Sequence, residues 1–76
     1  MKAFVLCKLT PGKEHKAAQT IRAIPGVTDV FSVFGAWDVI LSADADTMDK
    51  LCGMVVGKVR GVDGVSATET LVTTNL

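Results

Sequence analysis

The first half of the chain changes from a strand-like to a helix-like pattern of apolar residues. Lys2 to Leu9 is rich in branched and aromatic residues and stops at Thr10-Pro11-Gly12, which predicts a strand followed by a turn. Lys13 to Ile24 carries apolar residues at steps of three and four, with polar side chains between them, which predicts an amphipathic helix. Pro25-Gly26 ends this helix. Its apolar positions are Ala17, Ala18, Ile21 and Ile24.

The middle of the chain predicts a hairpin. Val27 to Phe34 and Trp37 to Ala43 are two strand-like runs, joined by a tight connection at Gly35-Ala36. Strands that follow each other so closely pair antiparallel.

A second helix and a last strand follow. Asp46 is placed as the N-cap and Thr47 as the first helical residue, while Gly61 and Asp63-Gly64 close the helix. The strand pattern returns from Val65 to Thr74. The predicted apolar stripe of the second helix consists of Met48, Leu51, Cys52, Val55 and Val59.

The order of elements is strand, helix, strand, strand, helix, strand. Ile24-Pro25-Gly26-Val27 and Val62-Asp63-Gly64-Val65 are equivalent helix-to-strand turns, so the chain consists of two half-repeats. This order predicts an α+β, ferredoxin-like βαββαβ sandwich, with a four-stranded antiparallel sheet and both helices on one face. Residues 1–76 form one domain of this kind.

Both faces of the predicted sheet are apolar at their centre. Strand side chains alternate between faces, so Phe4 and Leu6 lie opposite the other apolar residues of the first strand, and Ile40 lies opposite Val39 and Leu41. Several large apolar side chains facing water would form a sticky patch. We therefore predict a homodimer packed through the open sheet face, which is a dimeric α/β barrel.

Composition narrows the classes of partner. The 76 residues are 49% hydrophobic with a mean hydropathy of +0.40, and eight Lys and Arg balance eight Asp and Glu. A balanced charge supplies no field for holding nucleic acid or an anionic membrane. The longest apolar run, Ala3 to Cys7, is far shorter than a membrane span. We expect a cytoplasmic protein with no direct nucleic-acid or membrane partner.

Catalytic, metal and cofactor patterns are weak. Cys7 and Cys52 lie in apolar contexts without metal-ligand spacing and are predicted to be small buried hydrophobes. His15, the only histidine, is predicted to be solvated at the start of a helix. The acidic group at 44–49 fits helix capping better than a calcium loop, and the glycines have no phosphate-loop spacing. We predict no enzyme activity, no metal and no cofactor.

Two segments carry a resemblance to a known family. GAWDVIL (Gly35 to Leu41) and VSATETLV (Val65 to Val72) resemble the effector-binding (RAM) domain of the Lrp/AsnC feast/famine regulators. The two helix-to-strand turns fit the same family, so the resemblance covers essentially the whole chain. Regulators of this family carry an N-terminal helix-turn-helix domain, whereas this chain begins at the first strand, which leads us to expect a stand-alone effector domain.

The resemblance implies a free amino acid or related small metabolite as the ligand. Family members bind such ligands between dimers that assemble further into rings, and a stand-alone domain would also associate with full-length regulators. Asp38 would accept the ammonium group, and Thr68 and Thr70 would donate hydroxyls to the carboxylate. Gly35 would let the hairpin backbone approach the ligand, and Trp37 would wall the pocket or belong to the interface core. Without the resemblance, Asp38 fits a solvated hairpin end and the threonines fit ordinary strand propensity.

Two other functions share this fold. An ACT-like regulatory domain also binds amino acids, through a glycine-bearing loop after its first strand, where this chain has Thr10-Pro11-Gly12. A small dimeric α/β-barrel enzyme of the monooxygenase type encloses a reaction chamber between its sheets. The absence of tyrosine and the single histidine argue against the enzyme.

Overall fold

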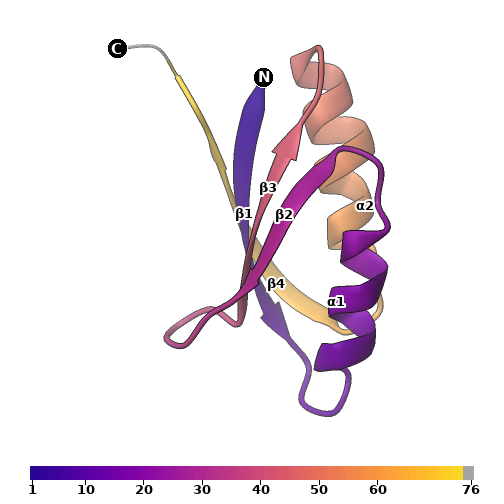
Figure 1. Ribbon diagram of the computed structural model, residues 1–76, viewed down its shortest axis with the longest axis vertical. Helices are drawn as coiled ribbons and strands as arrows, with labels where there is room; N and C mark the ends of the chain where they lie inside the picture. Colours follow the sequence, from indigo (N-terminus) through magenta and orange to yellow (C-terminus); the bar gives the residue numbers. More distant parts are fainter. Residues whose placement is uncertain (75–76) are drawn as a thin grey trace.

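The computed structural model describes residues 1–74, apart from the side chain of Met54, and it has the predicted order of elements (Figure 1). Both helical stretches cover one face of the sheet, so the ferredoxin-like sandwich is confirmed. The second helical stretch is continuous and consists of η1 and α2. The elements are β1 Lys2–Leu9, α1 Glu14–Arg22, β2 Val27–Ser32, β3 Val39–Asp44, η1 Lys50–Val56, α2 Gly57–Arg60 and β4 Val65–Val72.

The sheet has the strand order β2-β3-β1-β4, and each neighbouring pair is antiparallel. β1 and β3 therefore lie at the centre, while β2 and β4 form the two edges. A register shift between Lys8 and Leu9 interrupts the pairing of β1 with β4, and another between Val27 and Asp29 interrupts the pairing of β2 with β3. The predicted β2-β3 hairpin is confirmed.

The core lies between the sheet and the helices. Along β1 the residues alternate between buried and more exposed, and the residues facing the helices are fully or nearly fully buried. Burying each large apolar side chain contributes roughly 1.5–3 kcal/mol, so this layer supplies most of the stability. The core residues of β1 are Ala3, Val5, Cys7 and Leu9, and those opposite on the helices include Ala17, Ile21, Leu51, Val55 and Val59.

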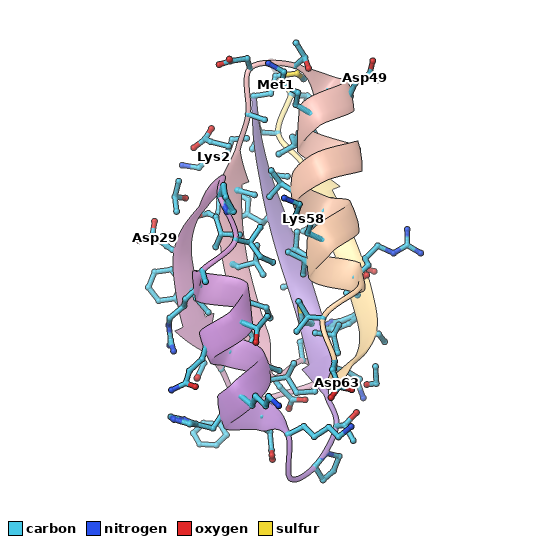
Figure 2. The ribbon with its side chains drawn as sticks, turned by 90° about the vertical axis from the view of Figure 1, so that its right-hand side faces the viewer. Met1, Lys2, Asp29, Asp49, Lys58 and Asp63 are labelled. Carbon is cyan, nitrogen blue, oxygen red and sulfur yellow. The ribbon has the colours of Figure 1, made fainter. Side chains whose placement is uncertain are left out.

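The two predicted helix-to-strand turns have the same geometry. Gly26 and Gly64 both have a φ of +98°, a left-handed conformation that glycine adopts without a steric penalty. Each glycine carbonyl accepts a hydrogen bond from the end of a strand in the other half-repeat. Asp44 N donates to Gly26 O at 2.8 Å, and Thr10 N donates to Gly64 O at 2.7 Å. Figure 2 shows Asp63 beside the second of these turns, and its carboxylate pairs with Lys13 Nζ at 3.1 Å. The half-repeat prediction is confirmed.

The second helix differs from its prediction. η1 is π-helical, with Gly57 N bonded to Cys52 O five residues back, and this wider turn rotates the apolar stripe. Leu51 and Val55 are buried as predicted, but Cys52 is exposed, so its prediction as a buried hydrophobe is wrong. Met48 is also exposed, at 42%. At the start of this helical stretch, Lys50 N donates to the Thr47 hydroxyl. The capping side chain is therefore that of Thr47, and not that of Asp46 as predicted.

The connection between β2 and β3 is wider than predicted. β2 ends at Ser32 and β3 begins at Val39, so both strands are shorter at this end than expected. Val33 N donates to Asp38 O at 3.0 Å, which leaves residues 34–37 as the loop. This loop projects to the side of the sheet away from the helices (Figure 1). Trp37 therefore lies in the loop and not in the third strand.

The other sheet face carries no helix. Ile40 of β3 pairs with Phe31 of β2 on one side and with Leu6 of β1 on the other. Two residues further along the same face, Phe4 of β1 pairs with Leu71 of β4. We call these five residues the open face. Phe31 is 57% exposed, Leu71 51% and Phe4 36%, so a large apolar surface faces solvent in the single chain.

Candidate functional site

A cleft of about 620 Å³ lies between α1 and the β2-β3 hairpin. We call it the hairpin cleft. One wall comes from α1, the other from the end of the hairpin, and its base from the β1-to-α1 connection. It combines apolar and charged side chains, as ligand sites do. Its lining residues are Leu9, Pro11, Glu14, His15, Ala18, Arg22, Ser32, Val33, Phe34, Asp38 and Val39.

Asp38 fastens the hairpin to β1. Its backbone N donates to Cys7 O at 2.9 Å, and its carboxylate Oδ2 accepts from Leu9 N at 2.8 Å. The ladder between β1 and β3 ends at the pair Cys7 and Val39, so the carboxylate satisfies a backbone donor of β1 just beyond the end of that ladder. One carboxylate oxygen is thereby held in place by the backbone of β1.

Three further titratable side chains of α1 line the hairpin cleft. Glu14 Oε1 accepts from Gly12 N, which holds this carboxylate at the base of the cleft. Arg22 forms no ion pair within the part of the chain that the structure describes. His15 is exposed, as predicted, and its Nε2 lies 3.3 Å from Gln19 Nε2. The cleft therefore presents charges of both signs.

The predicted threonines lie elsewhere on the chain. Thr68 pairs with Cys7 and Thr70 with Val5, so both face the helix-covered side of β4 and are half-buried. Thr68 lines a separate recess of about 330 Å³ together with Arg60 and Ser66. Because β1 and β3 stand between β4 and β2, this recess and the hairpin cleft lie toward opposite edges of the sheet. A single chain does not bring Asp38 and the threonines into one pocket.

Gly35 and Trp37 flank the hairpin cleft without lining it. Gly35 has a φ of +132°, which favours glycine, and no atom lies within 4 Å of where its side chain would begin. The backbone at Gly35 is therefore open to a close approach. Trp37 is half-buried in the loop.

The two cysteines differ in environment. Cys7 is fully buried, and burial raises the pKa of its thiol from 9.0 to about 11, so the thiol stays protonated at neutral pH. Cys52 is exposed, and its Sγ lies 3.5 Å from Met48 Sδ. Within residues 1–74, no group of three or more His, Cys, Asp or Glu side chains is arranged to hold a metal ion.

The predicted site residues do not include Glu14 or Arg22. Both lie on the polar side of α1, where charged residues are usually only solvated. Glu14, Ala18 and Arg22 follow one another at steps of four, which places them along one face of the helix. This spacing is the signal that points to them, and only the packing of α1 beside the hairpin makes that face a wall of the cleft.

The fold is a ferredoxin-like sandwich with a cleft beside its hairpin, and comparison with known proteins establishes its family. Residues 2–75 match the family model described as the Lrp/AsnC ligand binding domain. The chain therefore belongs to the Lrp/AsnC ligand-binding domain family, as the resemblance of its hairpin and last strand implied.

Relatives in this family are named as regulators. The chain is 36% identical over 73 residues to an uncharacterized HTH-type transcriptional regulator of Pyrococcus furiosus, and 34% identical to one of Pyrococcus horikoshii. Each alignment covers 92% of this chain and 49% of the relative, so the chain spans about half the length of these relatives.

Solved structures share the fold along the whole domain. The crystal structure of FFRP-DM1 matches with a TM-score of 0.88 and 27% identity, covering 96% of this chain and 97% of that chain. The regulator NMB0573 of Neisseria meningitidis, solved as a complex with L-Met, matches with a TM-score of 0.81 and 20% identity, covering 97% of this chain and 49% of that chain. At 20% identity the second match shows a similarity of fold alone. Within residues 1–74, no helix is long and apolar enough to span a membrane.

Proposed function

We propose that this domain binds a free amino acid or a closely related metabolite and acts as a regulatory module without catalysing a reaction. The observation that carries the proposal is the hairpin cleft, in which Asp38 and Arg22 offer partners for both charged ends of a zwitterion. Membership in a ligand-binding family supports it. So does the L-Met bound to the structural neighbour from Neisseria meningitidis.

The ligand site is shared between copies of the chain. Asp38 accepts the ammonium group, and Gly35 lets the hairpin backbone approach the ligand. Thr68 and Thr70 donate hydroxyls to the carboxylate from a neighbouring copy. The placement of these residues toward opposite sheet edges supports this arrangement, because an edge of one copy can meet the other edge of the next, and such head-to-tail contacts generate rings. Trp37, half-buried beside the cleft, reports on binding.

Assembly begins with a homodimer that covers the open face. Its exposed aromatic and aliphatic side chains support this partner, since a second copy presents the same apolar surface. Full-length Lrp/AsnC regulators carry a domain of the same fold, so mixed assembly with them is the proposed route to transcriptional control. Ligand would act by favouring one assembly state over another.

The test is a titration of Trp37 fluorescence and of binding heat with a panel of amino acids. We expect saturable binding of at least one class. Asp38→Asn keeps an oxygen acceptor for Leu9 N but removes the charge, so it should weaken binding about tenfold without loss of folding. Thr70→Val should weaken binding as well, with the assembly unchanged.

Two results would contradict the proposal. One is the absence of any binding heat in a folded, assembled protein. The other is undiminished affinity in both variants. Turnover of a quinone-like substrate would favour the dimeric α/β-barrel enzyme instead.

A further inference from the structure

The hairpin cleft contains more carboxylates than guanidinium groups. Glu14 and Asp38 contribute two carboxylates and Arg22 one guanidinium, so these three side chains carry a net charge of −1. A neutral zwitterion satisfies Asp38 and Arg22 and leaves Glu14 without a cationic partner. A ligand with one carboxylate and two cationic groups satisfies all three.

Both carboxylates are held in place before a ligand arrives. Leu9 N donates to Asp38 Oδ2 at 2.8 Å and Gly12 N donates to Glu14 Oε1 at 2.6 Å, and both donors belong to the end of β1 and the turn that follows it. Each carboxylate therefore has one oxygen fixed by the backbone and one available. Preorganised acceptors reduce the entropy that is lost when a cation binds.

The spacing along α1 favours a long ligand. Glu14 and Arg22 lie eight residues apart, which corresponds to a rise of about 12 Å along the helix axis. Helical side chains lean toward the N-terminus, and the bond from Gly12 N holds the Glu14 carboxylate on that side, so the two charged ends stay far apart. Ala18 lies between them on the same face, and the apolar lining residues Leu9 and Val39 can cover an aliphatic stem.

From this charge balance and spacing we infer that the hairpin cleft selects a basic amino acid with a long side chain, of the lysine or arginine class. Asp38 holds its α-ammonium, and Glu14 holds the cationic end of its side chain. Arg22 binds its carboxylate together with Thr68 and Thr70 of a neighbouring copy. This inference rests on the proposed amino-acid-binding function and names the class of ligand for the same site.

The experiment is calorimetry with L-lysine, L-methionine and L-glutamate as probes, on the full chain in its natural assembly. We expect lysine to bind at least about tenfold more tightly than methionine or glutamate, with an advantage that shrinks as salt increases. Glu14→Gln still accepts from Gly12 N, so it should reduce lysine affinity about tenfold and leave methionine affinity unchanged. Asp49→Asn removes the same charge at the far end of the molecule (Figure 2) and should change neither.

The outcomes separate the inference from the function on which it rests. If methionine or glutamate binds as tightly as lysine, or Glu14→Gln leaves lysine affinity unchanged, the basic-ligand inference is overturned while amino-acid binding stands. If none of the three probes, nor any other amino acid, binds to the folded protein, both are overturned.

Discussion

Burial changes the acid-base chemistry of the Cys7 thiol. Its thiol lies in the core between the sheet and the helices, where water cannot stabilise a thiolate, and its pKa rises to about 11. Cys52, the same residue type in a similarly apolar stretch of sequence, is exposed at the surface of η1. The surroundings of each cysteine, and not its neighbours in sequence, decide its chemistry.

The shift at Cys7 predicts a loss of stability in alkali. The unfolded chain ionises this thiol above pH 9, whereas the folded protein keeps it protonated up to about pH 11, so a rising pH favours unfolding. Between pH 8 and pH 10.5 the free energy of unfolding should fall by about 2 kcal/mol more in the wild type than in Cys7→Ala. Urea unfolding at the two pH values measures the difference, and an equal fall in both proteins would contradict the prediction.

At the scale of elements, the two helix-to-strand turns join the half-repeats to each other. Gly26 lies against Val55 of η1 and Asp44 of β3, while Gly64 lies against the start of α1. These turns could be predicted because each needs a glycine at a fixed distance from the preceding helix. The stripe of the second helix could be predicted only in part, because the π-helical turn that leaves Cys52 exposed leaves no mark in the apolar spacing.

Substitution at Gly26 tests this turn. A Cβ at Gly26 would lie 2.6 Å from Val55 Cγ2 and 3.1 Å from Asp44 O, and the φ of +98° adds backbone strain. We expect Gly26→Ala to destabilise the protein by about 2–4 kcal/mol. Gly53→Ala is the matched control, since that position is helical with open space around it, and it should be neutral or stabilise by up to about 1 kcal/mol. Thermal unfolding compares the two variants, and similar effects would show that the turn imposes no steric limit.

At the scale of the whole molecule, the sheet has one face covered by helices and one face, the open face, exposed to solvent. The two edges of the sheet are different, because the hairpin cleft lies beside β2 and the Thr68 recess beside β4. The proposed dimer would use the open face, and the two unlike edges are the proposed contacts for further assembly.

Leu6→Lys tests the open face. In a single chain the new ammonium group would lie beside Glu69, its cross-strand neighbour, so the fold should tolerate the change. In a sheet-to-sheet dimer the same charge would be buried near its copy, and the dimer should dissociate. Light scattering at micromolar concentration should show a dimer or larger for the wild type and a monomer for Leu6→Lys. Met48→Lys places the same charge on an exposed side chain just before η1, outside the open face and the hairpin cleft, and should leave the mass unchanged. A monomeric wild type would remove the basis for the dimer.

The sequence by itself determined the order of elements, the half-repeats and the family, because periodicity, helix-ending glycines and short motifs are local properties of the chain. It also placed Asp38 at the end of the hairpin. Only the tertiary structure decided that the Asp38 carboxylate holds Leu9 N and that Glu14 and Arg22 join it in one cleft. It also decided that Thr68 lies toward the other sheet edge. The physical reason is that these relations depend on strand order and on the packing of α1, which join residues far apart in the chain and leave no periodic trace in it.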